Sequence, residues 1–274
     1  MLNINSLYNW LWPEDGGPAV FGWYHIMWLA IMFLCCGLSI YFFARKHNDK
    51  TDKKFIFSIG AILIGIEIFK QIFKIVDQGY YDWDDIPFQF CSVPMYFAFA
   101  TIFIKNKKIK ETFYKFLASF GFLAGLAVMA FPDTVFNTQY IVMLIHTMIW
   151  HSSMVVMGVY LIVSRGYGKN IKELISPCIV FTSVVIFALV ANFVAQGIYF
   201  GNPNVDYHGD FNLFYISPYY GNPIPILGDI KEAVIFPLFF IVYLLAFFIG
   251  VGIVWAIIMG IRKLISLKNK KQIA

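Results

Sequence analysis

Seven apolar stretches recur along the chain, each close to the roughly 20 residues that a membrane-spanning helix needs. They lie at residues 22–44, 55–76, 87–104, 113–131, 139–163, 175–199 and 233–261. Short polar connections separate them, except that the connection at 200–232 is long and rich in aromatic residues. The pattern predicts an all-α, polytopic membrane protein with seven transmembrane helices.

The polar connections alternate in charge. Lysine and arginine dominate the first, third and fifth connections and the C-terminal end, at 45–54, 105–110, 165–172 and 262–271. The other connections are acidic. Because basic connections stay on the cytoplasmic side, the N-terminus is predicted outside and the C-terminus inside. Residues 1–21 then form an outer interfacial segment, 22–261 the membrane domain and 262–274 a basic cytoplasmic tail.

The composition is that of a membrane protein. Hydrophobic residues make up 59% of the chain and charged residues 14%, with a mean hydropathy of +0.69. A soluble domain is nearer half apolar and a quarter charged. We therefore expect an integral, multi-pass protein of a bacterial-type cell membrane, without a signal peptide. The inner connections account for the basic excess, so no nucleic-acid partner is expected. The four cysteines show no metal-ligand spacing and no disulfide framework, so we expect no metal and no cofactor.

Polar side chains interrupt the apolar stretches mainly in the predicted outer half of the membrane, whereas the inner half is expected to be almost purely apolar. Ionisable groups at this depth are costly and usually face the bundle interior. Their clustering predicts an outward-opening polar cavity, with the 200–232 connection either as its lid or as an interfacial aromatic belt. The polar residues are Glu67, Lys70 and Gln71 on one helical face, Gln89 and Cys91 in the third stretch, His146 and His151 in the fifth, and Asn192 in the sixth.

Each of these residues also has a purely structural interpretation. A lone cysteine in an apolar helix is most often a small buried hydrophobic residue, and a membrane histidine can simply hydrogen-bond between helices. Glu67 and Lys70 can form a structural ion pair. These interpretations do not explain why the costly groups share one half of the membrane.

Two prolines bracket Cys91 and leave its depth open. Pro87 suits the first turn of a helix, whereas Pro94 interrupts one. A helix that begins at Pro87 would place Cys91 about 6 Å deep, nearest to His146 at about 9 Å. An extended segment at about 3.3 Å per residue would place it about 16 Å deep, level with His151.

A thiol beside an imidazole suits acyl transfer through a thioester, because the histidine can take the thiol proton. Gln89 or Asn192 could then donate to the oxyanion, with Glu67, Lys70, Gln71 and His146 supporting the site or binding substrate. The alternative function is a non-catalytic transporter or receptor for a small polar ligand, with Glu67 and Lys70 as its binding pair. A third is a structural partner of other membrane proteins.

Several short motifs resemble the YwaF-type integral membrane family, which includes the animal transmembrane protein 164. The resemblance spans nearly the whole chain. The motifs are Ile-Pro-Phe-Gln-Phe-Cys at 86–91, Gly121 to Phe131-Pro132, Asn137-Thr138, Trp150-His151 and Tyr160-Leu161.

The resemblance implies a cysteine-dependent phospholipid acyltransferase, with Cys91 as the nucleophile and His151 as its partner. Its substrates would be membrane phospholipids or lysophospholipids, and a related acyl hydrolase remains an alternative. The animal member transfers a polyunsaturated acyl chain to a lyso-ether lipid. That substrate is not carried over, since Ser92 follows Cys91 here, whereas the animal cysteine lies in a Cys-His setting.

Overall fold

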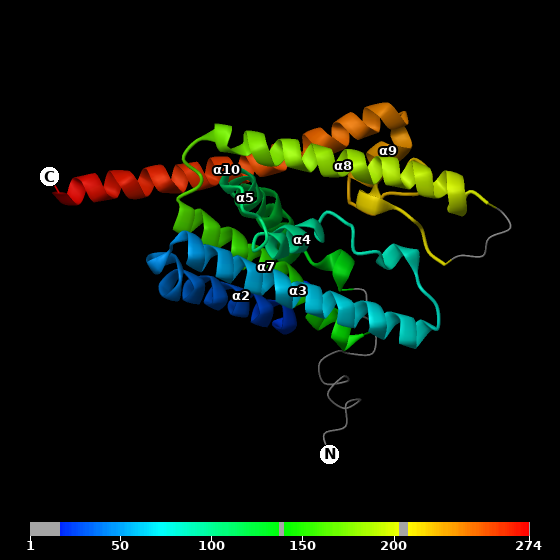
Figure 1. Cartoon of the computed structure of the whole chain (residues 1–274), viewed down its shortest axis with the longest axis horizontal. Helices are drawn as coiled ribbons and strands as arrows, with labels where there is room; N and C mark the ends of the chain where they lie inside the picture. Colours follow the sequence, from blue (N-terminus) through cyan, green and yellow to red (C-terminus); the bar gives the residue numbers. More distant parts are fainter. Residues whose placement is uncertain (1–16, 137–139, 203–207, 274) are drawn as a thin grey trace, which may run out of the picture.

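The computed structural model describes residues 17–136, 140–202 and 208–273, and all regular elements in this part are helices (Figure 1). The predicted interfacial segment 1–21 lies outside the described residues except for its last five positions. The main helices are α2 (Trp23–Phe42), α3 (Asp49–Gln78), α4 (Val93–Ala100), α5 (Lys107–Phe116), α6 (Phe122–Ala130), α7 (Ile141–Arg165), α8 (Ile175–Ala195), α9 (Leu227–Ala233) and α10 (Phe236–Ile273). Short helical turns are η1 (Ala44–Lys46), η2 (Trp83–Asp85), η3 (Leu117–Gly121), η4 (Asp133–Val135), η5 (Ile171–Leu174), η6 (Gln196–Phe200) and η7 (Leu213–Tyr215).

Six continuous helices of the described chain are long and apolar enough to cross a membrane. They coincide with six of the seven predicted stretches, so the chain is an integral, multi-pass membrane protein. Their bounds, with flanking turns included, are Trp23–Lys46, Asp49–Gln78, Lys107–Ala130, Ile141–Arg165, Ile171–Phe200 and Phe236–Asn269.

The third predicted stretch, 87–104, differs from the prediction. Only α4 is helical there, and its 8 residues rise about 12 Å, too little to span a membrane. Residues 86–92 are irregular and contain a turn in which the Ser92 N–H donates to the Gln89 carbonyl at 2.9 Å. The helix begins at Val93 because Pro94 has no N–H and is tolerated only in a first turn.

This broken segment runs antiparallel to α3. At one end, the Gln71 side chain donates to the main-chain carbonyl of Asp85 at 2.6 Å. At the other, the rings of Phe57 and Phe103 lie 6.4 Å apart. The two α3 residues are 14 positions apart, so the segment descends about 21 Å along α3.

Two glycines allow close helix packing near the cavity. A Cβ on Gly60 of α3 would lie 2.5 Å from the main-chain nitrogen of Phe99, which lies in the last turn of α4. A Cβ on Gly125 of α6 would lie 2.7 Å from the His151 carbonyl and 2.8 Å from the Met154 Cβ on α7. Both positions therefore require the absence of a side chain.

Aromatic rings hold the irregular turn before α4 against the bundle. The Phe90 ring lies 4.7 Å from Phe247 of α10, which lies 5.0 Å from Phe181 of α8. Phe181 in turn stacks on Phe120 of η3 at 4.6 Å. These ring contacts link the turn before α4 to α10, α8 and η3 in succession. The position of Phe90, and of the cysteine that follows it, therefore depends on all three elements.

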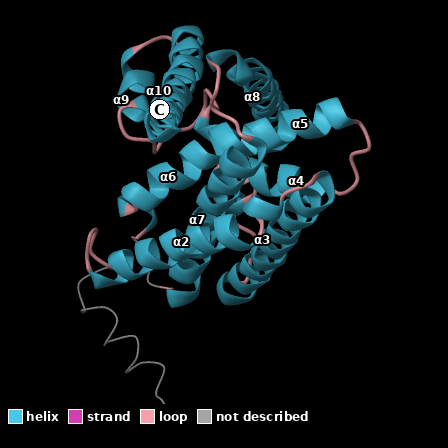
Figure 2. Ribbon diagram, turned by 90° about the vertical axis from the view of Figure 1, so that its left-hand side faces the viewer, coloured by secondary structure: helices cyan, strands magenta, loops and turns pink. Residues whose placement is uncertain are grey.

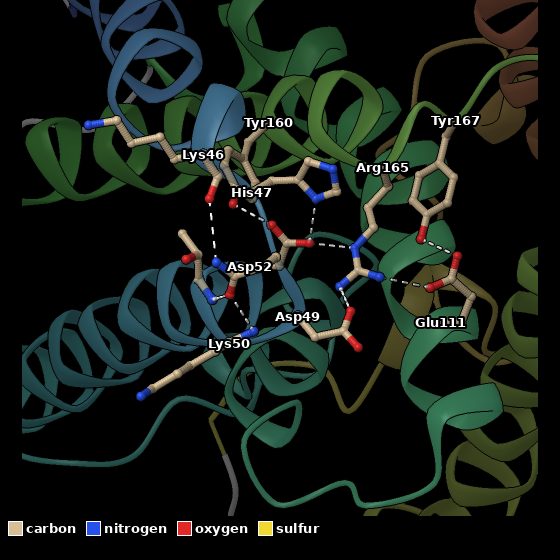
Figure 3. A network of polar contacts seen from close by, with 11 residues as sticks. Lys46, His47, Asp49, Lys50, Asp52, Glu111, Tyr160, Arg165 and Tyr167 are labelled. Atoms are coloured by element: carbon tan, nitrogen blue, oxygen red, sulfur yellow. Dashed lines mark hydrogen bonds and ion pairs between the residues drawn. The ribbon is translucent and has the colours of Figure 1, made fainter.

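A charged network joins α3, α5 and α7 at the other end of the bundle (Figure 3). Arg165 contacts Asp49 at 2.7 Å, Asp52 at 2.5 Å and Glu111 at 3.6 Å, and the Tyr160 hydroxyl donates to Asp52 at 2.6 Å. Asp52 is fully buried. Asp49, Asp52 and Arg165 lie in the connections predicted at 45–54 and 165–172, so the network does not bear on the expectation of an apolar inner half. The helices continue through charged residues that the hydropathy pattern assigned to solvated connections.

Candidate functional site

A cavity of about 1090 Å³ lies between α3, α6, α7, α10, the segment 84–92 and the segment 214–230. Six of the eight candidate residues named from the sequence line it: Cys91, His151, Gln89, Glu67, Lys70 and His146. Further polar lining residues are Lys74, Asp84, Asp85, Ser92, Asp133, Thr147 and Tyr215. Apolar side chains of α6, α10 and the 223–230 segment form much of the remaining wall.

Cys91 lies in the turn that precedes α4, level with the middle of α7. Its main-chain carbonyl accepts a hydrogen bond of 2.9 Å from the Trp150 indole N–H. A helix beginning at Pro87 is absent, and residues 86–92 form an irregular segment that includes a turn and is not fully extended. Ser92, the next residue in the chain, lines the same cavity.

His151 is buried in α7, and its Nδ1 lies 2.8 Å from the Thr147 carbonyl. A carbonyl oxygen can only accept, so we assign the proton to Nδ1, which leaves the Nε2 lone pair free to act as a base. Among the described contacts, no hydrogen bond joins the Cys91 sulfur to His151 or to His146. Catalytic hydrogen bonds are often long in proteins without substrate and shorten when it binds.

His146 is engaged with α3. Its Nε2 lies 3.4 Å from Glu67, and its ring stacks on Trp150 with centroids 5.2 Å apart. Glu67 also pairs with Lys70 at 2.8 Å and accepts from Gln71 at 2.7 Å. The carboxylate is thus surrounded by three partners, as expected for a charge that is almost fully buried. Both histidines line the same cavity although they are about 140° apart around the helix.

The predicted amide donors have different surroundings. Asn192 does not line the cavity: its side chain donates to the Leu213 carbonyl at 3.1 Å and accepts from the Leu213 N–H at 2.9 Å. It is therefore engaged in fixing the main chain. Gln89 donates to the Asn212 carbonyl at 3.0 Å. Gln71 lies behind the cavity and links Glu67 to the segment after α3.

The described part of the 200–232 connection folds back as a wall of the cavity. Phe214 is buried, and its carbonyl accepts a hydrogen bond of 2.9 Å from Tyr243 of α10. The Lys231 ammonium donates to the carbonyls of Ser217, at 2.5 Å, and Tyr220. Burial lowers the pKa of Lys231. Because Phe214 packs inside, this part of the connection is not simply an interfacial belt.

Acidic groups gather at the mouth of the cavity near the end of α3. Lys74 pairs with Asp85, and the Asp84 carboxylate accepts a hydrogen bond of 3.1 Å from the Asp210 N–H. Burial is the main cause that raises the pKa of Asp84, and the charge of the neighbouring Asp82 adds to it. Within the described residues, no group of three or more His, Cys, Asp or Glu side chains is placed to hold a metal ion.

Sequence reasoning gave no role to Trp150 or Tyr215. Trp150 was noted only as part of a motif, yet its indole N–H holds the Cys91 carbonyl. A signal was present, since a tryptophan deep in a predicted span needs a partner for its N–H. Nothing local indicated that Tyr215, in a connection far along the chain, would line the same cavity.

Comparison with known proteins identifies one family. A profile described as the TMEM164 family matches residues 20–255, which is most of the chain. No curated protein and no solved structure gives a significant match.

Proposed function

Since the chain belongs to the TMEM164 family, we propose that it is a membrane-embedded acyltransferase that carries a phospholipid acyl chain on Cys91 as a thioester. The related acyl hydrolase uses the same first step. One observation carries the proposal: Cys91 and His151 line a single large cavity. The proposed partners are membrane phospholipids and lysophospholipids.

The proposed reaction has two balanced steps. His151 Nε2 takes the proton from the Cys91 thiol, and the thiolate attacks the ester carbonyl of the donor lipid. The ester bond breaks, the proton passes to the departing lyso-lipid oxygen, and the acyl group remains on sulfur. An acceptor hydroxyl then gives its proton to His151, attacks the thioester and releases the thiol. Water in place of the acceptor gives hydrolysis.

The Cys91 N–H and the Ser92 hydroxyl are the proposed donors to the oxyanion. Cys91 and Ser92 are adjacent in the chain and both line the cavity, where charge would develop on the carbonyl oxygen during attack. Asn192 is not proposed for this role, because the Leu213 main chain occupies both ends of its amide.

An amphiphilic substrate suits the distribution of polarity in the cavity. Charged side chains near the end of α3, such as Lys70 and Asp85, lie in its wall, and apolar side chains of α6 and α10 complete it. The headgroup of a lipid would bind to the charged side chains near the end of α3. The acyl chain of the same lipid would contact the apolar side chains of α6 and α10.

For the membrane topology, we infer that residues 86–103 make the seventh crossing as a broken segment, with the N-terminus outside. Two contacts support a common inner end for the basic connections: Arg165 with Glu111 at 3.6 Å, and Arg262 with the Tyr167 carbonyl at 2.5 Å. In cells, a single cysteine introduced at Asp84 should react with an impermeant thiol reagent added outside, and one at Lys108 should not. The opposite labelling would invert the topology.

Substitution of the proposed nucleophile tests the function. Purified Cys91→Ser protein incubated with defined phospholipids should lack the hydroxylamine-sensitive acyl adduct that intact-mass analysis detects on the parent. Cys35→Ser and Cys178→Ser should retain it. Normal acyl transfer by Cys91→Ser would reject the mechanism and favour the transporter or receptor, with Glu67 and Lys70 as its binding pair.

A further inference from the structure

The helices α6 and α10 form one side of the cavity and approach each other closely at Gly250. A Cβ on Gly250 of α10 would lie 3.3 Å from a methyl carbon of Leu123 on α6. The two helices run in opposite directions, and in Figure 2 α6 lies between α10 and α2. From the contact, one turn toward the cavity mouth therefore leads to Ala127 on α6 and to Ala246 on α10.

Ala127 and Ala246 lie at the edge of the cavity lining. Both line the cavity and both are exposed, whereas Leu245 and Ile249, beside Ala246, are exposed but do not line it. On α10 the cavity lining therefore borders the outer surface of the bundle at Ala246. One turn farther, Phe131 and Val242 repeat the pattern as lining residues, and Phe131 is 72% exposed.

The surface around this edge of the cavity is apolar. Leu245 and Ile249, which flank Ala246 on α10, are 50% and 60% exposed. They lie within a helix that is long and apolar enough to span the membrane. An exposed apolar surface on such a helix faces lipid, so this edge of the cavity faces the hydrocarbon region and not the aqueous phase.

We propose that the gap between Ala127 and Ala246 is a lateral portal through which the acyl chain of a bilayer lipid reaches Cys91. A chain that passes from lipid to an apolar wall exchanges one apolar environment for another. A chain that came through the charged mouth would first have to enter water. Two small side chains, one from each helix, leave the necessary width. Transfer of the acyl group to Cys91 rests on the proposed function, whereas passage of the acyl chain through the portal does not.

The test measures alkylation of Cys91 and needs no acyl transfer. The parent carries Cys35→Ser, Cys36→Ser and Cys178→Ser, so that Cys91 is the remaining thiol, and is reconstituted in phosphatidylcholine vesicles. Two probes are compared by intact mass: N-hexadecylmaleimide dissolved in the bilayer, and a small charged maleimide in the water. Ala246→Trp should slow the bilayer probe at least about tenfold, which corresponds to about 1.4 kcal/mol of added barrier. The small probe should react as it does with the parent.

Matched variants separate the portal from a general disturbance. Ala127→Trp, on the opposite side of the gap, should reproduce the effect. Ile249→Trp, on the same lipid-facing helix but outside the cavity wall, should slow neither probe. The proposal is overturned if the bilayer probe does not label the parent, if Ala246→Trp leaves its rate unchanged, or if it slows both probes equally. Loss of acyl transfer without these results would concern only the proposed function.

Discussion

Replacement of His151 by alanine should remove the base from the proposed reaction and leave the fold intact. The imidazole donates from Nδ1 to the Thr147 carbonyl at 2.8 Å, so Nε2 carries the lone pair that a base needs. His146 makes a different contact, 3.4 Å from Glu67. The Trp150 indole donates to the Cys91 carbonyl at 2.9 Å and its ring stacks on His146, so this bond alone does not distinguish between the two histidines.

The expected magnitudes follow from these contacts. His151 uses Nδ1 for its hydrogen bond to the Thr147 carbonyl, which leaves Nε2 for the thiol, whereas His146 Nε2 already contacts the Glu67 carboxylate. Loss of a positioned base costs about 10²–10⁴-fold in rate. We therefore expect His151→Ala to slow formation of the Cys91 adduct by this factor. His146→Ala should slow it less than about tenfold, which is less than about 1.4 kcal/mol.

The assay follows the acyl adduct by intact mass over time, at saturating phospholipid, in protein whose thermal unfolding midpoint is unchanged. His151→Asn serves as a control, since its amide stands where Nδ1 does and can still donate to the Thr147 carbonyl but cannot accept a proton as a base. It should be as slow as His151→Ala. A greater loss in His146→Ala than in His151→Ala would refute the pairing, and full activity of His151→Asn would show that His151 acts through hydrogen bonding alone.

Three further predictions concern contacts around the cavity and in the charged network of Arg165. Trp150→Phe leaves the Cys91 carbonyl without its partner, a cost of about 1–3 kcal/mol; the adduct should form about tenfold more slowly, and an unchanged rate would deny the indole a positioning role. Arg165→Gln leaves Asp52 buried without its cation, which costs about 3–5 kcal/mol; thermal unfolding in detergent should shift clearly downward, in contrast to a conservative surface change such as Lys268→Gln. Burial raises the pKa of Asp84 in the folded protein, so its ionisation opposes folding as the pH rises through and above the ordinary value of 3.8. Asp84→Asn should therefore raise the unfolding midpoint at pH 7 and have progressively less effect toward pH 4, and a gain that grows on acidification would contradict this.

The amino-acid sequence by itself determined the class of protein and six of its long helices. Continuous apolar length is a local property, and a helix satisfies its own backbone hydrogen bonds inside a membrane. The polar face of α3 was equally predictable, because Glu67, Lys70 and Gln71 share a face by helical spacing alone. The family motifs pointed to Cys91 and His151, and the structure places both in one cavity wall.

The tertiary structure alone decided how these parts meet. Pro94 signalled a break, but only the fold showed that the Cys91 carbonyl bonds to the indole of Trp150, 59 positions away in the chain. The hydrogen-bond partner of the Asn192 amide, the Leu213 main chain, likewise lies in a connection farther along the chain. Hydropathy assigned Asp52 and Arg165 to water, yet the bundle buries their contact. Such contacts join residues far apart in sequence, and a local pattern of polarity carries no information about which distant partner will satisfy a buried polar group.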